Sequence, residues 1–279
     1  MDMDAISQER TVRTLIVSDL HLGARYSQAE NFLAYINTIR PEQVFVLGDF
    51  LDGWKLRARW HWRREYTGIL RRLFDWAESG VELFYTPGNH DDFLRCPELS
   101  DMLSKSGVQV SIRDEFVFKS LDGRRFLAFH GDKFDTVETR FPWLSHALTH
   151  AYDPLLTLNS WTNWWRGEPR GPYALCAAVK YRVKAAVRFL SHFEEQLERY
   201  TRERGCDGVI CGHLHTPRAA MLGRMAYFNS GDWVENCTAL VERLDGRLVL
   251  ESFFSAGAVE SEVCELASSA NDIVTTAAS

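Results

Sequence analysis

Polar side chains able to hold metal ions or to move protons recur at five points of this sequence, each directly after a short apolar run. The apolar run at residues 81–86, for example, leads into Gly88-Asn89-His90-Asp91. Ligands of open α/β sheets bind at the edge where the strands end, so we expect the five junctions to meet at one site. The metal-binding donors at these junctions are Asp19, His21, Asp49, Asn89, His130, His213 and His215.

Nitrogen and oxygen donors in this number are enough to hold two divalent ions. Each ion of such a pair needs about four to six ligands. One carboxylate must bridge the ions to hold them roughly 3.5–4 Å apart. Neutral imidazoles suit Mn, Fe and Zn, while carboxylate and amide oxygens add hard donors. The donor set therefore predicts a two-metal site with positions left open for solvent.

The elements that must position these donors alternate between strand and helix in the first part of the chain. Apolar runs predict buried strands at residues 13–18, 43–47 and 81–86. Helical periodicity predicts helices at residues 30–39 and 65–78, the first of them ended by Pro41. This alternation is typical of an α/β architecture.

The pattern changes after residue 107, where short strands follow one another. Asp122-Gly123 and Asp245-Gly246 have the composition of hairpin turns between such strands. We expect these strands to form a second sheet packed on the first. The predicted ranges are 108–112, 116–121, 125–130, 206–211, 225–229, 237–243 and 247–253.

Composition restricts the class of protein. The chain has 279 residues, 46% of them hydrophobic and 25% charged, as expected of a globular protein with a sizeable core. Its net charge of −6 argues against a nuclease or a nucleic-acid partner. Residues 1–10 lack the apolar stretch of a signal peptide, and the six cysteines include no CxxC pair. We therefore expect reduced thiols and a cytoplasmic location, with peripheral contact to the inner membrane left open.

The ordered series of polar blocks between residues 13 and 217 resembles the calcineurin-like metallophosphoesterases. Within that superfamily the chain looks most like the UDP-2,3-diacylglucosamine pyrophosphohydrolase group of lipid A synthesis and its relatives. The Trp-rich stretch after His130 and the segment Asn229-Ser230-Gly231-Asp232-Trp233-Val234-Glu235 support this narrower likeness. One position departs from it, because that group is expected to have Arg where this chain has His90.

The resemblance implies a four-layer α/β/β/α sandwich, two sheets flanked by helices, with an inserted helical cap. Residues 1–134 and 191–256 would form the core. Residues 135–190 would form the helical lid, and residues 257–279, mostly small and polar, a disordered tail.

The resemblance also implies roles for the site residues. Asp49 would bridge two divalent ions, Mn first and Fe or Zn as alternatives, and water would attack phosphorus in line. His90 and Asp91 are the predicted catalytic residues. His90 would stabilise the transition state or protonate the leaving oxygen, and Asp91, like Asp52, would orient the ligands. One ion would be held by Asp19, His21, Asp49 and His215, and the other by Asp49, Asn89, His130 and His213.

Two further segments supply candidate substrate contacts. Residues 54–64, rich in Trp and Arg, suit a partly buried helix, a phosphate-binding lining, or contact with anionic lipid. The lid tryptophans suit either a small core or an apolar substrate pocket. The basic residues of the same stretch, which include Lys180 and Lys184, suit either a solvated face or contact with a diphosphate or a lipid headgroup. The candidate contacts are Arg57, Arg59, Lys180, Lys184, Trp164 and Trp165.

Three functions fit the sequence. The first is metal-dependent hydrolysis of a nucleotide- or lipid-linked pyrophosphate such as UDP-2,3-diacylglucosamine. The second is a phosphodiesterase or phosphomonoesterase acting on a soluble substrate. The third is a non-catalytic scaffold with the same fold that has lost its metals. A scaffold of that kind should lack several donors, whereas all seven are present here.

Overall fold

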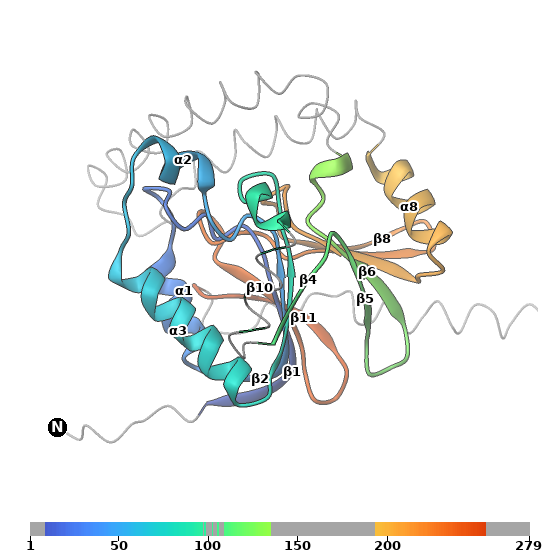
Figure 1. Ribbon diagram of the computed structural model, residues 1–279. Coiled ribbons are helices and arrows are strands. Elements are labelled where there is room, and N and C mark those ends of the chain that lie inside the picture. The colour runs from blue at the N-terminus through green and yellow to red at the C-terminus, as the bar shows by residue number, and fades with distance from the viewer. Residues whose placement is uncertain are drawn as a thin grey trace, which may run out of the picture.

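The computed structural model describes residues 9–96, 98, 102, 105, 109–134 and 193–254. It contains two β-sheets that lie face to face (Figure 1). From one edge to the other, the first sheet consists of β11 (Leu248–Ser252), β10 (Thr238–Glu242), β1 (Arg10–Val17), β2 (Ile39–Leu47), β3 (Glu82–Thr86) and β4 (Val110–Ile112). The second consists of β5 (Phe116–Lys119), β6 (Arg125–Ala128), β7 (Gly208–Cys211), β9 (Met225–Asn229) and β8 (Arg218–Leu222).

Helices cover the outer face of each sheet. The two helices against the first sheet are α1 (Ala29–Ile36) and α3 (Arg64–Glu78), and α8 (Phe193–Glu203) lies against the second (Figure 1). The short helix α2 (Gly53–Ala58) and the 3-10 turns η1 (Asp92–Arg95) and η2 (Asp132–Phe134) lie together at one end of the molecule (Figure 1).

Alternating side chains along the strands separate three apolar layers. Leu15 and Val17 of β1 pack with residues of α1 and α3, whereas Ile16 between them faces the second sheet. In the same way Phe126 of β6 faces the first sheet, and Leu127 packs with Leu197 of α8. Three apolar layers separate four layers of secondary structure, so the predicted α/β/β/α order is confirmed.

Three predicted strands belong to a different sheet from the one expected. β10 pairs antiparallel with β1 through Thr14 and Glu242, β11 pairs with β10, and β4 pairs parallel with β3. All three lie in the first sheet, so their assignment to the second sheet was wrong. An alternating pattern fixes which residues are buried but carries no information on the neighbouring strand. In the structure, β10 covers the side of β1 that would otherwise be a bare edge.

The prediction that Pro41 ends a helix was wrong. Pro41 lies inside β2, and α1 already ends at Ile36. The register explains why a strand can hold this proline. β2 pairs with β1 from Ile39 onwards, whereas its first partner pair with β3 is Gln43 with Glu82. β2 is therefore an edge strand on one side at Pro41, where a missing N–H is tolerated.

The parallel strands β1, β2 and β3 end at the same edge of the first sheet, and β6, β7 and β9 run parallel in the second. The hairpins predicted at Asp122-Gly123 and Asp245-Gly246 are confirmed, and they lie at the opposite end (Figure 1). The predicted lid at 135–190 and tail at 257–279 lie outside the described residues. Within the ranges given above, none of the helices has the length and apolar character to cross a bilayer.

Candidate metal centre

The loops after the parallel strands bring the predicted donors into one cluster. Ligand atoms lie within 4.8 Å of one another in three groups that share members. The groups are Asp19 with His21 and His215, His21 with Asp49 and His90, and Asp19 with Asp49 and His130. Because each group shares a residue with another, they describe one continuous cluster rather than three separate sites.

Asp49 lies at the centre of this cluster. Its Oδ2 atom is 3.5 Å from Nε2 of His130, 3.7 Å from Nε2 of His21 and 4.0 Å from Nε2 of His90. Its other oxygen accepts a hydrogen bond from the backbone N–H of His90 at 2.9 Å. One carboxylate oxygen thus faces three imidazole nitrogens that come from three different loops. A carboxylate that bridges two ions must stand in this position relative to their other ligands.

Asp19 shows that the cluster fits a cation. Its Oδ1 atom is buried and accepts no well-formed hydrogen bond. The same atom lies 3.1 Å from Nε2 of His215 and 3.9 Å from Nε2 of His21, and the two imidazole nitrogens are 3.2 Å apart. A divalent ion bound between these three atoms would satisfy all of them, and the mixture of nitrogen and oxygen suits Mn, Fe or Zn.

The remaining donors lie around His130. Its Nε2 atom is 3.2 Å from Oδ1 of Asn89, and its ring lies 5.1 Å, centroid to centroid, from the ring of His213. Its Nδ1 atom donates to the carbonyl oxygen of Leu47 at 2.8 Å, which turns Nε2 toward the cluster. All seven predicted metal donors are therefore gathered where parallel strands of the two sheets end.

The backbone is strained where the donors sit. Six non-glycine residues within the described ranges have a left-handed φ, and five of them are predicted ligands, with φ between 48° and 63°. Such conformations cost free energy for residues with a side chain and accumulate at functional sites. The five are Asp19, His21, Asp49, His213 and His215.

Two glycines allow neighbouring loops to approach the carboxylates. A Cβ atom on Gly88 would lie 2.3 Å from Oδ1 of Asp49, and one on Gly212 would lie 2.4 Å from Oδ2 of Asp19. Any side chain at either position would displace a predicted ligand, so these glycines belong to the site as much as the donors do.

Asp91 fixes the loop that carries Asp49. It is fully buried, and its Oδ2 atom accepts the backbone N–H groups of Phe50 at 2.7 Å and Leu51 at 3.2 Å. Its Oδ1 atom accepts the N–H of Gly88 at 2.6 Å and that of Asp49 at 3.3 Å. Asp91 therefore joins the loop after β2 to the loop after β3, which supports its predicted role in orienting the ligands.

His90 is held by two residues of the segment that begins α2. Its Nδ1 atom is 3.2 Å from Oδ1 of Asp52, which also accepts the backbone N–H of Lys55 at 3.0 Å as the N-cap of α2. The ring of Trp54 lies against the His90 ring, with centroids 3.9 Å apart. Trp54 lies in the segment 54–64 that the sequence offered as a possible lining of the site, but it was not among the predicted contacts. Its position two residues after Asp52, in the first turn of the helix that this residue caps, was the available signal.

The charges of the cluster act on one another. Burial opposes ionisation of Asp49, but His130 and His90 outweigh it and hold the pKa of that carboxyl well below its usual range. Burial likewise opposes protonation of His130, but Asp49 outweighs it and raises the pKa of that imidazole well above 6.5. Burial and the nearby His90 lower the pKa of His21, which favours the neutral form that binds metals. The carboxylates of the cluster thus favour positive charge beside them.

Two of the predicted substrate contacts, Arg57 and Arg59, lie outside this cluster. Arg57 is in α2 and Arg59 is its C-cap, and both side chains are exposed. The other four, Lys180, Lys184, Trp164 and Trp165, lie outside the described residues.

Three relatives of known name match between 42% and 89% of this chain. The UDP-2,3-diacylglucosamine hydrolase of Vibrio atlanticus is 22% identical over 261 residues, which cover 89% of this chain and 92% of that protein. The enzyme of the same name from Pseudomonas aeruginosa is 28% identical over 217 residues, 73% of this chain and 82% of that protein. The one from Porphyromonas gingivalis is 31% identical over 124 residues, 42% of this chain and 44% of that protein.

The calcineurin-like phosphoesterase family matches residues 12–217, a stretch that begins in β1 and ends just after His215. This stretch contains every donor of the cluster built above. The chain is therefore a metal-dependent phosphoester hydrolase and belongs to the calcineurin-like phosphoesterase family.

Proposed function

We propose that this chain uses two divalent ions to hydrolyse a nucleotide- or lipid-linked pyrophosphate such as UDP-2,3-diacylglucosamine. The observation that carries the two-ion centre is the position of Asp49 Oδ2 within 4.0 Å of three imidazole nitrogens. The relatives described above are named for hydrolysis of UDP-2,3-diacylglucosamine, which supports the substrate class.

Asp49 would belong to both ions, and Mn is the ion we propose, with Fe or Zn as alternatives. When bound, the ions would lower the pKa of water and neutralise charge on the phosphoryl oxygens. Asp19, His21 and His215 would complete one ligand set, and Asn89, His130 and His213 the other.

His90 would act on the leaving group. Because Nδ1 faces the carboxylate of Asp52 at 3.2 Å, that nitrogen carries a proton, and Nε2 is left facing the cluster. Water would lose a proton to solvent as its oxygen bonds to phosphorus. As the bond to the leaving oxygen breaks, a second proton, carried on Nε2 of His90, would pass to that oxygen. Trp54 and Asp52 hold the ring in the required orientation from two sides.

The test compares two substrates on Mn-loaded protein. We expect cleavage of UDP-2,3-diacylglucosamine to UMP and the acylated sugar 1-phosphate, and the matched Asp49→Asn variant to be inactive on both substrates. The second substrate is a soluble aryl phosphodiester. Cleavage of the aryl ester alone would reject the lipid-linked pyrophosphate and retain the hydrolase.

A phosphodiesterase or phosphomonoesterase on a soluble substrate is the second candidate. The observation that favours it is His90 itself, since the pyrophosphohydrolase group is expected to have Arg at this position. A His90→Arg variant separates the two candidates. If the lipid-linked substrate is correct, the Arg should supply the positive charge of the imidazolium without its proton, and the variant should keep part of its activity on that substrate. If a soluble ester is the substrate, the variant should lose activity.

A further inference from the structure

An exposed aromatic and basic surface begins at the C-terminal end of α2. The exposed fraction of Trp60 is 72%, the highest among the large apolar side chains that the structure describes. Basic and polar side chains around it are also exposed. We call this surface the Trp60 patch, made up of Arg57, Arg59, Trp60, His61, Trp62 and Arg64.

The Trp60 ring is fixed in its exposed position by its neighbour. It stacks on the ring of Trp62 with centroids 5.6 Å apart and planes 9° apart. The Trp62 indole donates to the hydroxyl of Thr67 at 3.0 Å and packs edge-on against the buried ring of Tyr66. Trp60 is therefore held outward on an anchored support, as expected for a side chain with a binding role.

The charge around Trp60 indicates an anionic partner. Residues 53–64 contain one lysine and four arginines without an acidic residue, in a chain whose net charge is −6. Glu65, the next residue, pairs with both Arg63 and Arg64. Arg57 and Arg59 form no ion pair with any residue that the structure describes, so their charges are available to a partner.

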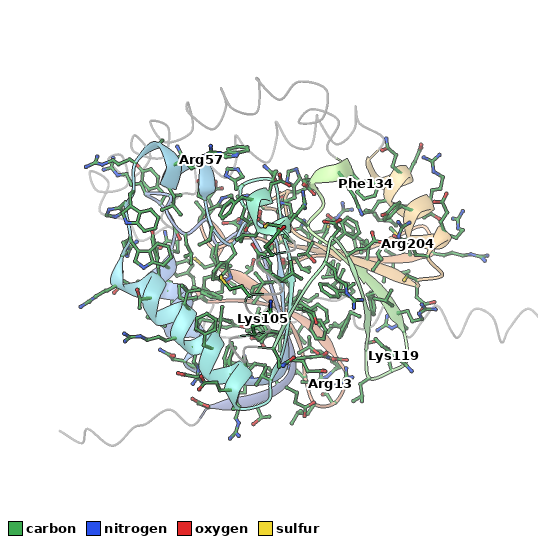
Figure 2. The ribbon with its side chains drawn as sticks, in the orientation of Figure 1. Arg13, Arg57, Lys105, Lys119, Phe134 and Arg204 are labelled. Carbon is green, nitrogen blue, oxygen red and sulfur yellow. The ribbon has the colours of Figure 1, made fainter. Side chains whose placement is uncertain are left out.

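We propose that the Trp60 patch docks the protein onto a bilayer that contains anionic phospholipid. Tryptophan is favoured at the level of the headgroups, and arginines beside it reach the lipid phosphates. Figure 2 shows Arg57 at the end of the molecule that carries α2, opposite Arg13 and Lys119. α2 also carries Trp54, which contacts His90, so docking through this patch brings the cluster to the membrane surface.

The test measures binding of the full-length protein to vesicles that contain no substrate, so its result does not depend on the proposed function. We expect cosedimentation with vesicles of phosphatidylcholine and phosphatidylglycerol, weaker at high salt, and none with phosphatidylcholine alone. The double variant R57Q/R59Q should bind roughly 30-fold more weakly, the equivalent of about 1 kcal/mol per charge. Trp60→Ala should bind roughly tenfold more weakly and still cleave a soluble aryl phosphodiester.

Two control variants match these changes elsewhere on the surface. R71Q/R224Q removes two exposed arginines from α3 and from the turn between β8 and β9, and Leu244→Ala removes a 55% exposed apolar side chain from the β10–β11 turn. Both should bind vesicles like the unmodified protein. The proposal is overturned if the patch variants keep full affinity, if the controls lose as much, or if the protein binds a polyanion such as RNA but no anionic vesicle.

Discussion

Two groups of buried carboxylates stand in contrast in this molecule. Glu242, at the end of β10, is fully buried and has a hydrogen-bonding partner for each oxygen. Its Oε2 atom accepts from the Thr14 hydroxyl at 2.7 Å and from Arg13, and its Oε1 atom accepts from the N–H of Leu121 at 2.7 Å. Leu121 follows β5 of the other sheet, so Glu242 joins the two sheets at the end where Figure 2 places Arg13 and Lys119.

Asp19 and Asp49 are buried as deeply but are not satisfied in the same way. Asp19 has an oxygen that accepts no well-formed hydrogen bond, and Asp49 faces three imidazole nitrogens at 3.5–4.0 Å. Burying a carboxylate is costly unless it is paired. The protein completes the bonding of Glu242 by itself, whereas a cation bound in the cluster would complete the bonding of Asp19 and would lie beside Asp49. The difference between the metal cluster and the structural carboxylate Glu242 is therefore whether protein groups satisfy the carboxylate oxygens, and not burial or residue type.

The largest effect is expected for Asp49→Ala. Loss of the carboxylate that we propose as the bridge should lower kcat on an aryl phosphodiester by about 10⁴-fold or more and reduce bound Mn, because both proposed ions would lose a ligand. Activity assays and metal analysis of the purified variant measure this. Added Mn should raise the Tm of the unmodified protein but not that of the variant. Near-normal turnover would show that Asp49 is not the bridge.

Glu242→Ala should show the opposite result. It leaves Arg13, the Thr14 hydroxyl and the Leu121 N–H without their shared acceptor, so the free energy of unfolding should fall by about 3 kcal/mol. Bound Mn and kcat in the folded protein should not change. Urea denaturation measures the first quantity, with an unchanged m-value as the check on two-state unfolding. Loss of metal from this variant would mean that the two carboxylate groups are coupled.

His90→Gln tests a residue that contacts the cluster without being assigned to either ligand set. We expect kcat on a substrate with a poor leaving group to fall about 10²-fold while bound Mn is retained, because the proposed general acid is lost. The loss should be smaller for an aryl ester, whose leaving oxygen needs no proton. Asp52→Asn should give about a tenfold loss through disorientation of the ring. Equal losses on both substrates would exclude proton donation by His90.

The site was easier to predict than its surroundings, for physical reasons. The sequence predicts site residues such as Asp19, His21 and Asp49 because a polar side chain directly after a buried apolar run seldom has a purely structural role. The contact of Trp54 with His90 could not be predicted from the sequence. The segment contains several tryptophans, and nothing in its pattern distinguishes one that packs on His90 from one that packs on the core. Sheet membership of β4, β10 and β11 depends on partner strands far away in the sequence, which local patterns do not contain. Pro41 was wrongly predicted to end a helix. A strand can hold proline at this position only because the pairing of β2 with β3 begins after it, at Gln43.

Glu115 provides a carboxylate between the two extremes and the smallest predicted effect. It lies near the surface and accepts hydrogen bonds from Arg204 at 2.5 Å, Lys133 at 2.8 Å and the Tyr200 hydroxyl at 2.6 Å. Partial burial opposes its ionisation, but these partners outweigh it and lower the pKa of Glu115 from 4.5 to about 2. Its ionised form therefore stabilises the fold above pH 4.5, and this contribution is lost as the pH falls from 4.5 toward 2.

Glu115→Gln should lower the free energy of unfolding by about 1 kcal/mol at pH 7, after allowance for solvent screening. The difference from the unmodified protein should vanish as the pH falls through this window, and urea denaturation at pH 7, 5 and 3 measures it. A difference that is the same at pH 7 and pH 3 would mean that Glu115 acts through packing rather than charge. Because Glu115 is satisfied like Glu242 but is less buried, a penalty as large as that of Glu242→Ala would show that burial does not set the scale of these effects.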